Sequence, residues 1–205
     1  NDTCGNAEHD GVHTFYVGKN AKVRYVERHY ADGSGTGKKV FDPVTKIYLK
    51  ENAQFILEST QLGGVTYTER KTYATVGKNA QLLVKEKILT DGEEKAITDF
   101  KVKLSGKNSR ADIVSRSVAK GNSLQQFKSD MVGKNECFGH VECDGIVLDG
   151  ARIISTPKID AVSPEASLVH EAAVGKIAGE QLLKLMSLGL SEQEAEDAVI
   201  KGFLN

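Results

Sequence analysis

The chain lacks several features that would assign it to a common functional class. It has no tryptophan in 205 residues, and its 27 Lys and Arg residues are balanced by 28 Asp and Glu residues, for a net charge of −1. A protein without a cationic excess lacks the electrostatic footprint of nucleic-acid or anionic-membrane binding. No apolar run approaches the ~20 residues that a membrane-spanning helix requires. We therefore expect no nucleic-acid partner and no membrane partner.

The cysteines are too few, and odd in number, to form a disulfide framework. Cys4, Cys137 and Cys143 cannot all pair, which fits free thiols in a reducing cytoplasm. No secretion signal is recognisable, but the chain begins at Asn1 rather than Met, so a leader or an N-terminal domain could have been removed. The expected localisation is cytoplasmic.

A short phrase ending in asparagine, usually Gly-Lys-Asn, recurs along the chain and is followed each time by β-forming residues. The asparagines are Asn20, Asn52, Asn79, Asn108 and Asn135, spaced by 32, 27, 29 and 27 residues. A period of this size is typical of stacked repeat architectures. Counted from each asparagine, odd positions are mostly apolar and even positions mostly polar, as in a strand with one buried face. Glycine and asparagine tolerate the positive φ that a tight corner requires.

A second β-forming segment lies between successive corners, at 40–49, 65–76, 96–104 and 123–131. Each period therefore holds about two strands, and equivalent positions in successive copies carry similar residues. These features predict a right-handed parallel β-helix of roughly five coils over residues 1–155. The alternative, an antiparallel sandwich, would not explain why one corner motif returns at one period.

The remaining residues, 156–205, have a different pattern. Pro157 and Pro164 interrupt regular structure, which predicts a linker strand before a short α-helical hairpin. The hairpin could seal the end of the solenoid, present a docking surface, or do both.

The two helices of this hairpin have clear boundaries. The first covers 179–188, where apolar residues recur at helical spacing, and Gly189 follows it as a C-terminal stop. Ser191 and Glu194 form a capping box for the second helix.

A glycine-rich stretch at 33–39 suggests a phosphate-binding loop, but its spacing does not fit. Asp32 stands where the motif needs its first glycine, and Lys39 stands where it needs Ser or Thr. We expect an ordinary loop, and no nucleotide bound by this chain.

Cys137, His140 and Cys143 are spaced like a metal cluster. On a continuous strand, however, the two cysteines lie about 20 Å apart on one face, with His140 on the other. Counted from Asn135, Cys143 falls at the outer position that earlier copies fill with polar residues. The pattern thus predicts an outward-facing thiol that is either incidental or available to a partner.

Another pair of polar residues, His170 and Glu171, follows the linker. Neighbouring residues on a strand point to opposite faces, so at most one of the two can be buried. By itself, the pair reads as an ordinary strand residue beside a solvated acid.

The end of the chain resembles a known family. Cys143-Asp144-Gly145 is followed by HEAAVGKI at 170–177, EQL at 180–182, GLS at 189–191 and Glu194-Ala195. With the β-helical repeat before them, these motifs resemble the C-terminal core of SufB and SufD, scaffold proteins of the SUF iron–sulfur cluster assembly system. The chain would be such a core domain or a minimal homologue.

This resemblance implies partners and a site. The chain would pair through its β-helix, with itself as a homodimer or with a SufB/SufD paralogue, and would bind the ABC-type ATPase SufC through its C-terminal helices. A transient iron–sulfur cluster would form at the interface, with Cys143, His170 and Glu171 as the assembly residues. Cys137 and His140 are additional candidates.

Together these features predict a non-catalytic scaffold for iron–sulfur cluster assembly. One thiolate with imidazole and carboxylate ligands would hold iron less tightly than four thiolates, as product release requires. The alternative is a β-helical carbohydrate-active enzyme, which the absence of tryptophan disfavours because sugar sites usually offer aromatic platforms. A hexapeptide-repeat acyltransferase would need a six-residue period, which the sequence does not have.

Overall fold

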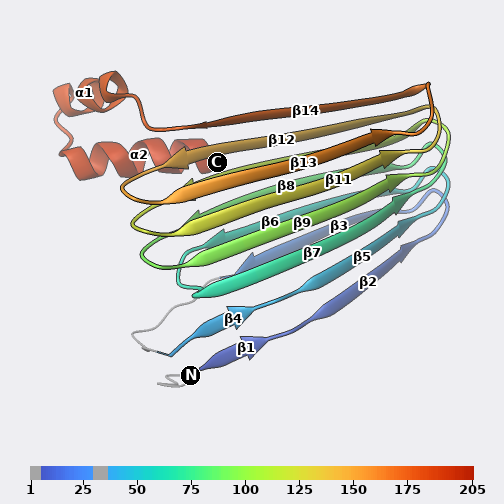
Figure 1. Ribbon diagram of the computed structural model, residues 1–205, viewed down its shortest axis with the longest axis horizontal. Helices are drawn as coiled ribbons and strands as arrows, with labels where there is room; N and C mark the ends of the chain where they lie inside the picture. The colour runs from blue at the N-terminus through green and yellow to red at the C-terminus, as the bar shows by residue number, and fades with distance from the viewer. Residues whose placement is uncertain (1–5, 30–36) are drawn as a thin grey trace.

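The computed structural model describes residues 6–29 and 37–205 of the chain. Its strands form two parallel sheets that face one another, and the chain crosses from one sheet to the other at each corner (Figure 1). The result is a β-solenoid of about six turns followed by two helices. The prediction of a mainly β, parallel β-helix with a C-terminal helical hairpin is confirmed.

The strands form an eight-stranded sheet A and a six-stranded sheet B. Sheet A contains β1 (Ala7–His9), β2 (Val12–Val17), β4 (Lys39–Phe41), β5 (Val44–Leu49), β7 (Tyr67–Val76), β9 (Lys95–Leu104), β11 (Leu124–Gly133) and β13 (Arg152–Ala161). Sheet B contains β3 (Lys22–His29), β6 (Gln54–Leu62), β8 (Gln81–Thr90), β10 (Ser109–Ala119), β12 (Cys137–Val147) and β14 (Ala166–Gly175).

The recurring asparagines hold one row of corners together. Asn20, Asn52, Asn79 and Asn108 all have left-handed backbones, with φ between 54° and 62°. Their side-chain amides form a ladder in which each Nδ2 donates to the Oδ1 one coil below, at 2.9, 3.1 and 3.2 Å. The repeated motif therefore supplies both the turn conformation and a bond between coils.

The fifth asparagine, Asn135, does not occupy an equivalent corner. The strand register aligns Ser109 with Cys137, so Glu136 stands where Asn108 stands in the preceding copy. Asn135 is also not among the residues with positive φ. The Gly-Lys-Asn phrase lies one residue earlier relative to the strands, with Gly133 as the last residue of β11, so Glu136 follows the asparagine within the corner. Counted from Asn135, every later residue of the copy is therefore displaced by one position.

The shift reverses the predicted orientation of Cys143. Its register partner on β10 is Ser115, not Arg116, and its side chain lies in the core between the sheets. The expectation of an outward-facing thiol at Cys143 is therefore wrong, because a one-residue slip along a strand exchanges the two faces.

Residues 156–175 add a sixth coil to the solenoid. β13 pairs with β11 and β14 pairs with β12, in parallel and in register. Pro157 lies within β13, where it is tolerated because β13 is the edge strand of sheet A. The structure thus places the end of the solenoid at Gly175 rather than at residue 155.

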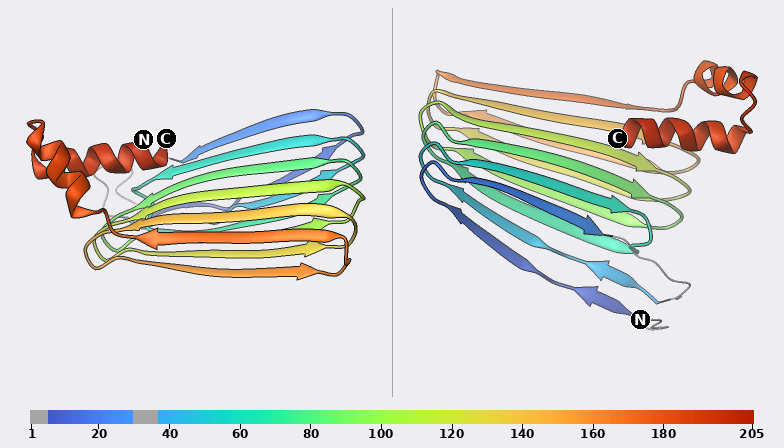
Figure 2. Two further views of the ribbon diagram at one scale, coloured as in Figure 1. Left: turned by 90° about the horizontal axis from the view of Figure 1, so that it is seen from above. Right: turned by 180° about the vertical axis from the view of Figure 1, so that it is seen from behind.

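The hairpin consists of α1 (Gly179–Ser187) and α2 (Glu192–Leu204) and projects beyond one end of the strands (Figure 2). Gly189 has a φ of 99°, and the predicted capping box of Ser191 and Glu194 is present. Ile200 and Leu204 of α2 pack against Val118 on the outer side of sheet B. No helix in the described ranges is both long and apolar enough to span a membrane.

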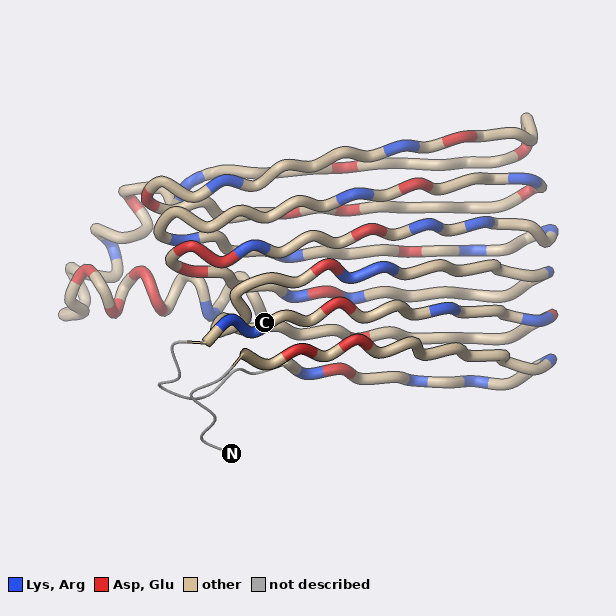
Figure 3. Tube along the Cα trace, turned by 60° about the horizontal axis from the view of Figure 1, so that its bottom comes forward, with Lys and Arg blue, Asp and Glu red and all other residues tan. Residues whose placement is uncertain are grey.

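Both signs of charge are interspersed along the coils (Figure 3). This distribution agrees with the small net charge of the sequence. The chemically distinctive groups are instead found inside the solenoid and at its last coil.

Candidate functional site

Cys143 lies on the inner face of β12 and is 1% exposed. Burial raises the pKa of its thiol to about 11, against the opposing effect of the neighbouring Ser155 hydroxyl. At neutral pH the side chain is therefore a thiol rather than a thiolate. It becomes a strong ligand only when a metal ion displaces its proton.

His170 shares this inner face, one strand nearer the end of the solenoid. Its register partner on β12 is Val141, an inward-facing core residue, and its own strand, β14, is the last of sheet B. Burial, followed by the nearby His140, lowers the pKa of the imidazole. The ring is thus neutral at physiological pH and can offer a nitrogen lone pair to a metal ion.

A polar atom on the inner face of β14 is buried without a partner. His170 Nε2 makes no hydrogen bond within the described part of the chain, whereas the Ser155 hydroxyl faces the Cys143 thiol. A buried polar atom without a hydrogen bond costs about 1–3 kcal/mol, so such atoms in a native structure need an explanation. A bound ligand that supplies the missing hydrogen bond would be such an explanation.

Glu171 points to the opposite face. Its side chain is 67% exposed, and its Oε2 lies 3.9 Å from Nε2 of His140. The other ring nitrogen of His140, Nδ1, is 2.9 Å from Oδ1 of Asp112. The predicted residues are therefore divided by the sheet: Cys143 and His170 lie inside, and Glu171 and His140 lie outside.

The other cysteine on β12, Cys137, is buried six residues before Cys143 on the same inner face. Burial raises the pKa of its thiol. Cys4 and residues 33–36 of the glycine-rich stretch lie outside the described residues. Across residues 6–29 and 37–205, no three His, Cys, Asp or Glu side chains are grouped so that they could hold a metal ion.

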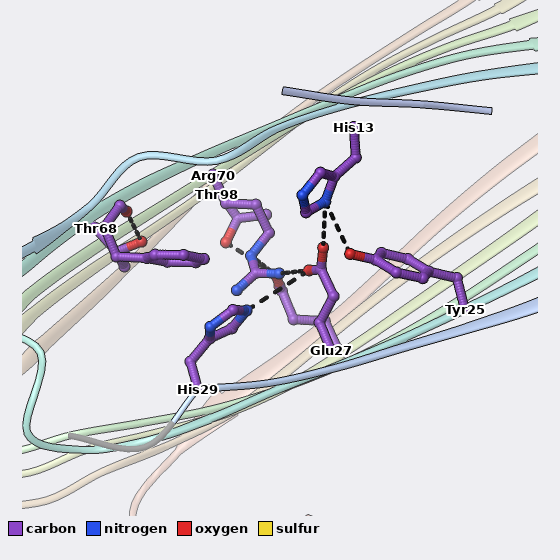
Figure 4. Close-up of polar contacts among 9 residues, drawn as sticks. His13, Tyr25, Glu27, His29, Thr68, Arg70 and Thr98 are labelled. Carbon is purple, nitrogen blue, oxygen red and sulfur yellow. Dashed lines mark hydrogen bonds and ion pairs between the residues drawn. The ribbon is translucent and has the colours of Figure 1, made fainter. Parts of the chain in front are cut away.

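The interior also contains a charged cluster that the sequence analysis missed (Figure 4). Arg70 Nη1 lies 2.5 Å from Glu27 Oε2, and Arg70 Nε lies 3.9 Å from Glu86 Oε1. Glu86 also accepts hydrogen bonds from Thr98 and Ser115. A correct register for the fifth copy would have shown that Glu27, Glu86 and Cys143 share one position in the repeat.

Glu27 is surrounded by cationic and titratable side chains. Its carboxylate faces His13 at 3.6 Å and His29 at 3.8 Å as well as Arg70 (Figure 4). Burial alone would raise its pKa, but His29, Arg70 and Tyr25 outweigh burial and hold it at about 2. The cluster therefore stabilises an ionised carboxylate inside the solenoid.

Comparison with known proteins gives a consistent family. The model of the SufBD core domain, described as SUF system FeS cluster assembly, matches residues 2–203. An iron–sulfur cluster assembly SufBD family protein of Archaeoglobus fulgidus is 34% identical over 197 residues, which cover 96% of this chain and 52% of that protein. One from Methanothermobacter thermautotrophicus is 31% identical over 209 residues, covering 100% and 50%.

The chain spans about half the length of these two relatives. A SufBD family protein of Galdieria sulphuraria is 25% identical over 193 residues, which cover 90% of this chain and 87% of that protein. Since the family model covers nearly the whole sequence, the chain belongs to the SufBD family of iron–sulfur cluster assembly proteins.

Proposed function

We propose that this chain is a non-catalytic scaffold on which an iron–sulfur cluster is assembled before transfer, in a reducing cytoplasm. The observation that carries the proposal is the inner face of the last two coils. There, in a SufBD family chain, a protonated buried thiol at Cys143 lies one strand from a neutral imidazole at His170 with an unpartnered nitrogen.

These two side chains offer a soft sulfur ligand and a borderline nitrogen ligand for iron. When ferrous iron binds, the Cys143 S–H bond breaks, its proton leaves to solvent and an iron–sulfur bond forms. A site with fewer thiolates than the four of a resident cluster holds its cargo less tightly. A scaffold that must release its product needs this weaker hold.

Pairing through the last coil would complete the site. No further strand of the described chain covers the inner faces of β13 and β14, and Ile159 and Val174 are 44% and 45% exposed there. Apolar residues and open strand edges favour association with another chain. A second copy, or a SufB/SufD paralogue, in this position would bring two thiol–imidazole pairs together, with Glu171 and His140 at the rim.

The C-terminal hairpin offers a second docking surface, for a SufC-like ABC ATPase. Within the described residues α1 buries none of its side chains, and it exposes Leu183, Met186 and Leu188. An amphipathic helix with an uncovered apolar face is a common recognition element. The ATPase would supply the energy for assembly, since we expect no nucleotide on this chain.

Anaerobic reconstitution with iron and sulfide in the presence of the ATPase tests the proposal. Cys143→Ser should abolish cluster absorption and transfer to an apo-acceptor, while Cys137→Ser, on the same face of the same strand, should leave both near the wild-type level. Normal assembly by Cys143→Ser with loss in Cys137→Ser would contradict this assignment and favour Cys137 with His140.

A further inference from the structure

The two signs of charge are segregated on the outer face of sheet B, although they are interspersed over the molecule as a whole. By strand alternation, the first four strands of this sheet place seven basic side chains on that face: Lys22, Arg24, Arg28, Lys85, Lys87, Arg110 and Arg116. The same four strands place two carboxylates there, Glu58 and Asp112. A surface with this excess of positive charge attracts acidic partners.

The two carboxylates of this region are already engaged, whereas one of its cations is free. Glu58 pairs with Arg24 at 2.7 Å, and Asp112 Oδ1 lies 2.9 Å from His140 Nδ1. Arg110 instead lies over the ring of Phe138, with its guanidinium carbon 5.3 Å from the ring centroid, and makes no ion pair with the described part of the chain. Its N–H donors are therefore available to an incoming carboxylate.

A groove crosses the outer face of sheet B beside this free guanidinium. Its volume is about 410 Å³, and it runs over β6, β8 and β10 to Phe138 on β12. The register partners Ile56 and Leu83 give it an aliphatic floor, and a second pair of partners, Gln54 and Gln81, lines it with amides. Binding sites for small ligands commonly measure about 300–1,000 Å³ and combine an apolar surface with a few polar groups.

These features match a short extended peptide segment that carries an acidic and an aliphatic side chain. The aliphatic side chain would cover Ile56 and Leu83, a carboxylate would bind Arg110, and the glutamine amides would pair with the peptide backbone. A nucleic acid matches less well, because single strands bind open aromatic faces and the ring of Phe138 is covered by Arg110.

We propose that this groove binds an acidic segment of a partner protein, with a leucine or isoleucine side chain on the aliphatic floor. The groove lies near the asparagine corners, at the start of the strands, whereas the C-terminal hairpin lies beyond their other end (Figure 1). It is therefore separate from the surface proposed for the ATPase. The inference goes beyond the scaffold function and does not depend on it.

The test is fluorescence anisotropy of a labelled Glu-Glu-Leu-Leu-Glu-Glu peptide titrated with the full chain at low salt. Binding should be saturable, and the matched Lys-Lys-Leu-Leu-Lys-Lys peptide should bind roughly tenfold more weakly or less. Arg110→Glu should weaken binding of the acidic peptide roughly tenfold or more, because it reverses the charge that meets the carboxylate. Lys103→Glu is the matched control, since Lys103 is exposed on the outer face of sheet A.

A second variant, Leu83→Lys, distinguishes a groove from diffuse attraction between charges. It adds a positive charge to the face but removes half of the aliphatic floor. A segment docked in the groove should therefore bind several-fold more weakly, whereas diffuse attraction would make binding tighter. Leu83 and Arg110 both lie on the outer face of their strands, so both variants should keep the thermal midpoint of the wild type.

Each outcome decides the inference. It is overturned if the acidic peptide shows no saturable binding, if the basic peptide binds equally well, if Arg110→Glu and Lys103→Glu have equal effects, or if Leu83→Lys binds more tightly. Tighter binding of a labelled oligo(dT) strand would assign the face to nucleic acid instead. A lower mass of Arg110→Glu in light scattering would assign it to a second copy of the chain. No iron or sulfide is present in these measurements, so failure of the scaffold function would leave them unchanged.

Discussion

Glu27, Ser59, Glu86, Ser115 and Cys143 occupy one register position on successive strands of sheet B, and all five side chains are buried. At the residue scale this row shows how a stacked fold gives distant residues a common environment. Buried charges are rarely optimal for stability and need close partners. Here Arg70 lies between the two glutamates and provides one.

Glu27→Gln should lower the free energy of unfolding by on the order of 3 kcal/mol at pH 7, the equivalent of a pKa held at about 2 against an unfolded value of 4.5. A depressed pKa stabilises the fold above pH 4.5, and this contribution is lost as the pH falls toward 2. The variant should therefore show a flatter decline of stability between pH 4.5 and 2 in denaturant titrations.

The matched control for this change is Glu58→Gln. Glu58 lies one strand away and pairs with Arg24 on the outer surface, where ion pairs contribute roughly 0–1 kcal/mol. Equal losses of stability in the two variants would show that the buried cluster contributes no more to stability than a surface ion pair.

The asparagine ladder permits a second test at this scale. Asn79→Ala puts alanine, which tolerates a φ of 54° less well than asparagine, at this corner and removes two inter-coil hydrogen bonds of the side-chain amide. The variant should lower the free energy of unfolding by about 2 kcal/mol. Asn79→Gly keeps the backbone conformation and should cost about half of that. Asn135→Ala, outside the ladder, should cost least in the same chemical denaturation series, and the reverse order would refute the role of the corners.

At the scale of elements, the sequence period predicted the two-strand coil and the asparagine corners, and helical spacing with capping residues predicted both C-terminal helices. The prediction from the period failed at the fifth corner phrase, whose residues take different positions in the turn. Asn135 ends a Gly-Lys-Asn phrase like its predecessors, but this phrase lies one residue earlier relative to the paired strands, and only backbone pairing reveals that. The corner between β13 and β14, where the phrase would recur, contains Ser163 and Pro164 instead, so the sixth coil was hidden as well.

The arrangement of the candidate site was only partly predictable from the sequence. The assignment of Cys143, His170 and Glu171, which rests on family motifs, stays a prediction, and strand alternation correctly separated the faces of His170 and Glu171. The register error placed Cys143 on the wrong face. Proximity between Glu171 and His140 depends on the pairing of β12 with β14, which the expected linker did not include.

The exposed apolar residues of the hairpin form the docking surface that we propose for the ATPase. Leu183→Asp combined with Leu188→Asp should weaken binding of the ATPase roughly tenfold or more, because exposed apolar anchors dominate helix docking. Stability should hardly change, since these side chains are 66% and 73% exposed. Calorimetry of the two proteins measures the effect, with Val12→Asp, 65% exposed at the far end of the solenoid, as the control. Unchanged affinity would place the docking site elsewhere.

At the scale of the whole molecule, the two ends of the solenoid differ. The end formed by β13 and β14 exposes inner-face apolar residues above the Cys143 site, and we expect another chain there. Ile159→Arg should convert a dimer into a monomer in light scattering at micromolar concentration, because it buries a charge in the interface. Val26→Arg, on β3 at the opposite end and comparably exposed at 42%, should leave the mass unchanged. The opposite pattern would move the interface to the first coil.

We propose that a cluster is assembled at the last coils of this chain, on Cys143, where two family chains meet. The decisive experiment is native mass spectrometry of the anaerobically reconstituted protein, alone and mixed with a SufB/SufD paralogue. We expect iron and sulfide bound only to a two-chain species, and their loss from Cys143→Ser but not from Cys137→Ser. Iron and sulfide retained on a single chain, or on Cys143→Ser, would contradict it.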